Sequence, residues 1–291
     1  SSGNITVAAT ANASSYYEAF ANANATDGGI EQTVSTSGGG NLTVDATAMI
    51  DNSGYIHMTA DAFADSQSGS ASAEANVEEG IEQRATAGEV SGNALGYITN
   101  SGSSSVDIFA HASASAYLFA NAEANASLGI EQDVEAFVGD ATGEIENSGL
   151  LSVGASAFAT SQSGSARANA IVGANEGSLR QAGGVSQDVS TGSGNAKANM
   201  TSDGNVVVSG SAIANGYSGA NANTQVGSEV FGLGGEEDVA AGLLQYVQVR
   251  NNGNAEGTLN NNGTIDIDAL ASATATSGAA TANAQVDEAL R

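Results

Sequence analysis

The sequence predicts an all-β protein, a flattened two-sheet β-solenoid of about five and a half coils with one coil per sequence repeat. Three observations lead to this prediction. A motif that starts with a turn signal recurs along the whole chain. Within it, apolar residues occupy every second position, as on a strand with one buried face, and the chain contains no proline.

The recurring motif is clearest in NSGYIHMTADAFA, which begins at Asn52. Near-copies begin at Asn100, Asn147, Ser202 and Asn261, and the chain opens on SSGNITVAATANA. The glycine of each copy marks a repeat, which divides the chain into repeats 1–50, 51–98, 99–145, 146–200 and 201–259 and a partial repeat 260–291. Because solenoid repeats stack on their neighbours, we expect a single repeat domain over residues 1–291.

The first strand of each repeat follows the turn signal. In repeat 51–98, Ile56 and Met58 are followed by alanines at every second position up to Ala64. On a strand these residues line one face, whereas on a helix they would spread around the axis. Large residues lead and alanines follow, so the predicted core is thin.

Two further strands and a short closing strand complete the predicted coil. The polar turn SQSGS leads into the alanine-rich strand ASAEANV, and a Glu-Glu-Gly step ending at Gly80 precedes the strand GIEQRA. A short strand such as NAKANM, from Asn195, reaches the next turn signal. We expect the short and the following long strand to form one leg, the other two strands to form the second, and coils to stack about 4.8 Å apart. The alternative is a four-strand antiparallel meander in each repeat.

One glutamine recurs in the third strand of five repeats, at Gln32, Gln83, Gln132, Gln187 and Gln245. Its spacing keeps step with the marker glycines, because Gln132 to Gln187 and Gly149 to Gly204 both span 55 residues. Stacked coils would place these side chains above one another, so we predict a structural ladder of amide-to-amide hydrogen bonds. The fourth and fifth repeats are longer, and we expect loop insertions at 173–183 and 227–235.

The charge balance excludes several classes of partner. The chain has 6 Lys and Arg residues against 32 Asp and Glu residues, a net charge of −26, so we expect no nucleic-acid partner. No run approaches the roughly 20 apolar residues of a membrane-spanning helix, so no membrane span is expected. The absence of cysteine removes disulfides, thiolate catalysis and cysteine-ligated zinc. The start at Ser1, without an initiator Met, indicates a processed protein or part of a longer one.

The ionisable residues indicate no catalytic centre. The only two histidines, His57 and His111, fall at outward positions of the first strand in adjacent repeats, and we interpret them as solvated. We therefore predict that the protein is not an enzyme and has no catalytic residue and no cofactor. Carboxylate pairs on one strand face are weak candidates for a calcium site, and a solvated acidic face is the simpler interpretation. These candidates are Asp61, Asp65, Asp266 and Asp268.

Large apolar residues also fall at outward positions of the first strand. Phe63, Phe109 and Phe158, together with Leu270, are predicted at equivalent outward positions, where they would form an apolar stripe across the coils. Such a stripe is either a lateral contact between solenoids or incidental exposure.

The two ends of the sequence lack the atypical repeats that cap soluble solenoids. Residues 1–50 read as an ordinary repeat, and the partial repeat stops at VDEALR, before the position of the glutamine. We expect either a segment of a longer array or a coil that the next molecule completes, head to tail.

The repeat unit Asn-Ser-Gly-x-Ile-x-Val-x-Ala-x-Ala resembles repeats of large secreted bacterial β-solenoid proteins, such as adhesins and autotransporter passengers. The segment GVSQDVSTGSGNAKA, from Gly184, is more weakly similar to the fibre subunit curlin, although the step from Gln187 to Asn195 is longer than in curlin. Both resemblances imply an extracellular or cell-surface location and a structural or adhesive role, for example in a biofilm matrix.

The leading hypothesis for function is an extracellular structural protein, a subunit or segment of a self-assembling filament or surface layer. Its partner would be a second copy, head to tail and also laterally. The alternative is an adhesin stalk or a glycan-binding β-solenoid module. A polysaccharide lyase or hydrolase is disfavoured, because acidic sugar substrates require basic residues that this chain lacks.

Overall fold

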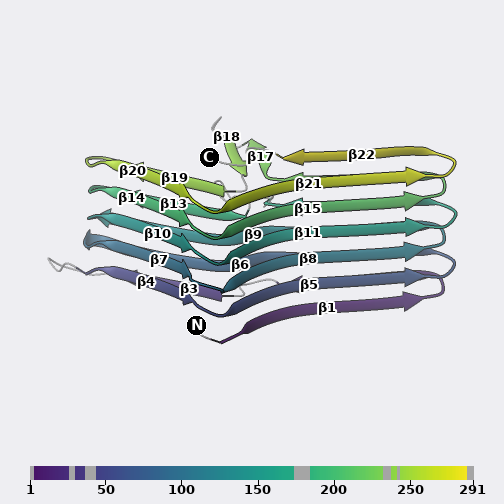
Figure 1. Cartoon of the computed structure of the whole chain (residues 1–291), viewed down its shortest axis with the longest axis horizontal. Helices are drawn as coiled ribbons and strands as arrows, with labels where there is room; N and C mark the ends of the chain where they lie inside the picture. The colour runs from purple at the N-terminus through teal and green to yellow at the C-terminus, as the bar shows by residue number, and fades with distance from the viewer. Residues whose placement is uncertain are drawn as a thin grey trace.

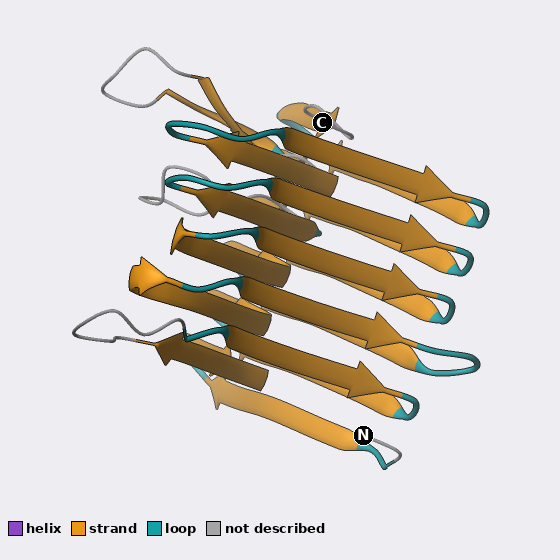
Figure 2. Ribbon diagram, turned by 90° about the vertical axis from the view of Figure 1, so that its left-hand side faces the viewer, coloured by secondary structure: helices purple, strands orange, loops and turns teal. Residues whose placement is uncertain are grey.

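The computed structural model confirms the all-β solenoid (Figure 1). It describes residues 3–25, 30–36, 44–173, 184–231, 237–240 and 243–286, which contain strands and turns and no helix. Over these residues there is accordingly no helix long and apolar enough to cross a membrane. Figure 2 shows the coils as a stack in which each repeats the outline of its neighbour.

The first sheet contains the long strands that follow each turn signal. Their inward residues are the predicted aliphatic and alanine positions, for example Ile56, Met58 and Ala60, which are fully buried. In sheet order the strands are β1 (Ile5–Ser15), β5 (Tyr55–Ser66), β8 (Ser105–Ala116), β11 (Leu150–Ser161), β15 (Asn205–Gly216) and β21 (Thr264–Ala275).

The second sheet contains the short strands that precede each turn signal. They are β4 (Ala46–Asn52), β7 (Ala94–Asn100), β10 (Ala141–Asn147), β14 (Ala196–Ser202) and β20 (Ala255–Asn261). The chain passes from each short strand to the next long strand through the Asn-Gly turn, so the first two sheets together form the predicted first leg.

The third sheet forms the second leg and contains both the alanine-asparagine and the glutamine strands. Its members are β2 (Glu18–Ala25), β3 (Ile30–Thr36), β6 (Ser70–Ser91), β9 (Phe119–Val138), β12 (Ser165–Val172), β13 (Val185–Thr191), β16 (Gly219–Val226), β19 (Leu243–Val249) and β22 (Ala279–Val286). A separate antiparallel hairpin pairs β17 (Ser228–Phe231) with β18 (Glu237–Ala240).

Every strand of the three large sheets pairs in parallel with the equivalent strand of the next coil. Ile5 aligns with Ile56, Ile56 with Val106, and Gln83 with Gln132. An antiparallel meander would instead pair consecutive strands of one repeat, so that alternative is wrong.

The predicted break between the second and third strands is absent in two coils. Strands β6 and β9 run without interruption through the Glu-Glu-Gly step and its equivalent, because the backbone there continues to pair from coil to coil. Of the predicted insertions, residues 174–183 lie outside the described residues, whereas the insertion at 227–235 contains β17 and lies partly outside them.

The core lies between the two legs and is made mostly of alanine, with larger aliphatic residues near the Asn-Gly turns. The legs approach closely where glycine precedes the glutamine strand. A Cβ atom added at Gly129 would lie 2.1 Å from the carbonyl oxygen of Gly184 and 2.5 Å from Val153 Cγ2. The recurring Gly-Ile-Glu-Gln sequence therefore reflects a lack of space at this position.

Candidate functional site

The five glutamines form one continuous ladder, referred to below as the glutamine ladder. In each step Nε2 donates to Oε1 of the glutamine in the preceding coil. The distances are 3.0 Å for Gln83 to Gln32, 2.9 Å for Gln132 to Gln83, 2.7 Å for Gln187 to Gln132 and 2.9 Å for Gln245 to Gln187. The three central side chains have no exposed surface.

Each donor glutamine also ties the two legs of its own coil together. Nε2 of Gln132 donates to the carbonyl oxygen of Glu144 at 3.2 Å, and equivalent bonds run from Gln83 to Tyr97, from Gln187 to Asn199 and from Gln245 to Thr258. Gly143 leaves room for this contact, because a Cβ there would lie 2.8 Å from Gln132 Oε1. Leaving such buried groups unpaired would cost about 1–3 kcal/mol each, so the ladder enforces register between coils and between legs.

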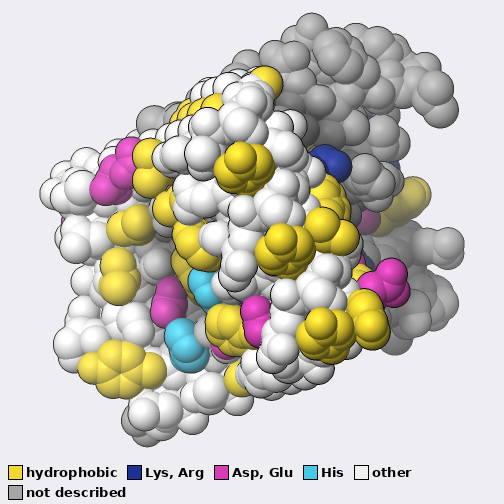
Figure 3. Space-filling model, turned by 90° about the vertical axis from the view of Figure 1, so that its right-hand side faces the viewer, with side chains coloured by type: hydrophobic (Ala, Val, Ile, Leu, Met, Phe, Trp, Pro, Cys, Tyr) yellow, Lys and Arg dark blue, Asp and Glu magenta, His cyan; other side chains and the backbone are white. Residues whose placement is uncertain are grey.

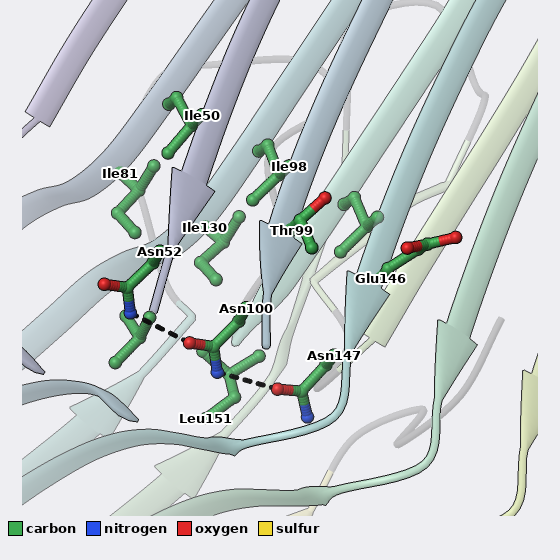
Figure 4. Close-up of a pocket in the computed structure, with 12 residues that line it drawn as sticks. Ile50, Asn52, Ile81, Ile98, Thr99, Asn100, Ile130, Glu146, Asn147 and Leu151 are labelled. Carbon is green, nitrogen blue, oxygen red and sulfur yellow. Dashed lines mark hydrogen bonds between the residues drawn. The ribbon is translucent and has the colours of Figure 1, made fainter. Parts of the chain in front are cut away.

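A second ladder runs through the asparagines of the turn signals, and sequence reasoning missed it (Figure 4). Nδ2 of Asn52 donates to Oδ1 of Asn100 at 2.9 Å, Nδ2 of Asn100 to Oδ1 of Asn147 at 2.8 Å, and Nδ2 of Asn147 to Oγ of Ser202 at 3.2 Å. All four side chains are buried. Their recurrence before the marker glycine was the available signal, which was interpreted only as a turn.

The interior next to this asparagine ladder is packed and offers no room for a ligand. The cavity in Figure 4 has a volume of about 10 Å³ and lies among stacked isoleucines such as Ile50, Ile98 and Ile145. A single water needs at least about 10–15 Å³ of comparable space together with polar partners. The interior next to the asparagine ladder is therefore a packing feature of the bend between the first two sheets.

The two ladders run in opposite directions, since each donor glutamine bonds to the preceding coil and each donor asparagine to the following one. The glutamine ladder begins at Gln32, whose Nε2 is not used as a donor within the ladder, and ends at Gln245, whose Oε1 is not used as an acceptor within it. The long-strand sheet has an open edge at each end of the stack, since β1 pairs within its sheet only with β5, and β21 only with β15. The inward residues of these two strands, Ile5 and Ile265 among them, are only partly buried.

A small ionic cluster lies on the outer face of the glutamine strands. Arg84 Nε contacts Asp133 Oδ2 and Arg84 Nη2 contacts Glu82 Oε1, both at 3.2 Å. Burial alone would lower the pKa of Arg84, but the carboxylates of Asp133 and Glu82 outweigh burial and raise it. The cluster links coils two and three and offsets part of the repulsion between stacked carboxylates.

Two acidic side chains on β10, Glu144 and Glu146, repel each other. Partial burial raises the pKa of Glu144, and the neighbouring carboxylate of Glu146 raises it further, while Lys197 lowers it. Both belong to the outward face of the short-strand sheet. This pair is a local repulsion that the fold tolerates.

The two histidines face acidic residues of the adjacent coil. His57 Nδ1 lies 3.0 Å from Asp107 Oδ2, and His111 aligns with Asp61 across the same pair of strands. The rings of His111 and Phe63 are 5.4 Å apart. Both histidines are partly exposed on the outer face of the long-strand sheet, as predicted from the sequence.

The carboxylates proposed as weak calcium ligands remain separate. Asp61 and Asp65 lie on β5. Asp266 and Asp268 lie on β21, four coils beyond β5. Over the described ranges, no group of three or more His, Cys, Asp or Glu side chains is arranged to hold a metal ion.

The predicted apolar stripe is wrong in its alignment. Phe63 and Phe158 share one row, in which Ser113 lies between them, but Phe109 aligns with Thr59 and Gly154, and Leu270 belongs to the row of His111. The reason lies in the spacing from the marker glycines, which is nine residues for Phe63 and Phe158 but seven for Phe109 and Leu270. In coil three, two extra residues between Asn100 and β8 shift Phe109 by two further positions. These residues do not form a continuous stripe.

Comparisons with known proteins return no match to a family model, to a curated protein or to a solved structure.

Proposed function

We propose that this chain is an extracellular structural protein whose solenoids stack head to tail into a filament or surface layer. The observation that carries the proposal is the pair of open strand edges at the first and last described coils, where β1 and β21 each have one partner strand in their sheet and half-buried inward residues. These surfaces are complementary in backbone and in apolar rows.

A head-to-tail junction would repeat the contact between neighbouring coils. β1 would pair with the partner's β21 in the parallel register found inside the stack, so that Ile5 would align with the partner's Ile265 and Ala9 with the partner's Ala269. Such a contact is heterologous and does not close, so it can add subunits without limit. The same edge would accept a further coil of a longer chain.

Head-to-head association is disfavoured by the same geometry. A head-to-head contact between two β1 strands would reverse the direction of one of them, so that Ile5 would face an alanine such as Ala13 and not another aliphatic residue. An edge strand with unpaired backbone groups readily recruits another strand, and the half-buried aliphatic rows add an apolar gain. Assembly in one direction therefore satisfies both the backbone and the side chains.

The extracellular location rests on the similarity to secreted solenoid repeats and is compatible with the cysteine-free, acidic composition. Neither the location nor the assembly depends on a catalytic or metal centre.

Negative-stain electron microscopy of the purified chain tests the assembly. We expect unbranched filaments with a subunit repeat near 29 Å, since six coils rise about 4.8 Å each. Particles that remain monomeric at high concentration in sedimentation experiments, with the described fold intact by circular dichroism, would overturn the proposal.

A further inference from the structure

The turns that join the long-strand sheet to the third sheet alternate in length from coil to coil. Two residues connect the strands in coils one, three and five, at 16–17, 117–118 and 217–218, and three residues connect them in coils two, four and six, at 67–69, 162–164 and 276–278. We refer to these six turns as the turn ridge. It forms the edge at the right of Figure 1, and it repeats every two coils.

The side chains of the turn ridge follow the same alternation. The first turn residue is tyrosine in the odd coils and a smaller polar residue in the even coils, in the order Tyr16, Gln67, Tyr117, Gln162, Tyr217 and Thr276. The three tyrosines are 58%, 43% and 47% exposed. Figure 3, which views this edge, shows hydrophobic side chains at separate levels with polar surface between them.

Hydrogen bonds from the following coil fix the backbone of each of these three tyrosines. Its carbonyl oxygen accepts a hydrogen bond at 2.8 Å from the backbone N–H of a serine in the following coil. The hydroxyl of that serine donates to the same oxygen at 2.7, 3.1 and 3.0 Å, for Ser68, Ser163 and Ser277 respectively. The spacing of the tyrosines is therefore set by the fold and not by chance exposure.

The turn ridge is free of charge in a strongly acidic protein. None of its residues is Asp, Glu, Lys or Arg, although the chain has a net charge of −26. Interface centres are typically depleted of charge and enriched in tyrosine. An uncharged partner on the ridge itself covers no ionic group, although the exposed carboxylates of Glu18 and Asp65 flank it, and the overall field repels a polyanion.

From this arrangement we infer that the turn ridge binds a neutral, extended β-1,4-linked polysaccharide, lying along the stack. The apolar C–H face of a sugar ring packs against an aromatic side chain, and the phenol, amide and hydroxyl groups of the ridge can bond to its hydroxyls. In such a polymer every second ring presents the same face. The length of one ring is close to the coil rise, so a contact every two coils, about 9.6 Å, matches the polymer repeat.

Several weak contacts on one chain act together. Each tyrosine would hold a single sugar poorly, but three on a rigid support raise the effective concentration of the next contact. Reaching from Tyr16 to Tyr217 spans four coil steps, about 19 Å, so binding should strengthen up to a length of about five rings. This inference does not depend on filament formation, because the turn ridge lies on the side of the stack.

The test compares the full-length wild-type chain with two variants in pull-down on microcrystalline cellulose and chitin, and in calorimetry with cello-oligosaccharides. The triple variant Tyr16→Ser, Tyr117→Ser, Tyr217→Ser should bind at least tenfold more weakly. The swap variant Tyr117→Gln, Gln162→Tyr keeps the number of tyrosines but destroys their two-coil spacing, and it should lose a similar factor. Tyr55→Ser, at an exposed tyrosine outside the ridge, is the matched control and should bind as the wild type does.

Wild-type protein that binds neither polymer overturns the inference. So does equal binding by the swap variant, which would mean non-specific adhesion of aromatic residues. Tighter binding to the acidic polymer polygalacturonate would contradict the charge argument. If the triple variant only abolishes lateral bundling of the protein, the turn ridge is a contact between copies of this chain and not a polysaccharide site.

Discussion

Gln132 donates from Nε2 to Gln83 Oε1 at 2.9 Å, and both side chains are completely buried in the core between the two legs of the solenoid. Gln132 also receives the bond from Gln187 and reaches the carbonyl oxygen of Glu144. One side chain thus connects three coils and both legs. Because a partner left unpaired in the core loses hydration without compensation, the central rungs of the ladder should dominate its contribution to stability.

Gln132→Leu should lower the free energy of unfolding by roughly 3 kcal/mol, because it leaves three buried groups without a partner. Gln32→Leu should cost less, since Gln32 is only half-buried and occupies the end of the ladder. Urea denaturation followed by circular dichroism measures both. Equal losses at the two positions would show that the ladder bonds are not the source of the effect.

Assembly should respond to a charge on the inward face of the first strand. Ala9→Asp places a carboxylate in a half-buried row that Ala269 of the partner subunit would cover, and burying an unpaired charge is costly. We expect monomers at neutral pH. Protonation of the introduced carboxyl group below about pH 4 removes the charge, so filaments should return there.

The control for this experiment is Ala8→Asp, which makes the same substitution at the neighbouring, outward-facing position of β1. Electron microscopy and sedimentation at both pH values compare the two variants. If Ala8→Asp blocks assembly equally, net charge and not burial of the inward row governs the junction.

The sequence allowed prediction of the features that recur as the same residue at the same position. The glutamine ladder is such a case, because parallel stacking converts an identical residue in each repeat into a row. Asn52 and Asn100 recur equally, but asparagine before glycine is also a common turn signal, so local turn chemistry concealed their tertiary role.

Other features depend on local insertions that the sequence does not align by itself. Phe109 lies two residues closer to its marker glycine than Phe63 does, and two additional residues after Asn100 shift it by two further positions, so it falls in another row. The alternation of the turn ridge was also missed, since the exit of the first strand at Tyr16 or Tyr117 carries no glycine or proline to mark it. Only the coil-to-coil pairing fixes these positions.

The asparagine ladder should stabilise the bend between the first two sheets. Asn100 donates to Asn147 Oδ1 and to the carbonyl oxygen of Leu150, and it accepts from Asn52 and Ser104. Asn100→Ala should therefore reduce the free energy of unfolding by about 2–3 kcal/mol. In Asn261, an exposed member of the same series, the side chain donates only to the carbonyl oxygen of Gly263, so Asn261→Ala should cost below about 1 kcal/mol.

Hydrogen exchange would locate the effect of Asn100→Ala. We expect faster exchange at residues 100–105 and in the adjacent turns, with the strands of the third sheet unchanged. Uniform acceleration through all coils would contradict a local role for the ladder.

The repulsion between Glu144 and Glu146 predicts a stability that depends on pH in an unusual direction. The folded protein raises the pKa of Glu144 above its ordinary value, by burial and by the carboxylate of Glu146. A group whose folded pKa is raised stabilises the fold below its unfolded pKa, and this contribution is lost as pH rises through the folded pKa. Ionisation of Glu144 at neutral pH therefore weakens the fold.

Glu144→Gln should consequently be more stable than the wild type at pH 7, and the difference should vanish below about pH 4, where the wild-type carboxyl group is also neutral. Thermal unfolding over this pH range is the measurement. Glu146→Gln should give a smaller gain, because it removes the repulsion but leaves Glu144 partly buried. The double variant should gain less than the sum, because either change alone removes the same repulsion. Strictly additive gains would mean that the two carboxylates do not interact and that burial alone raises the pKa of Glu144.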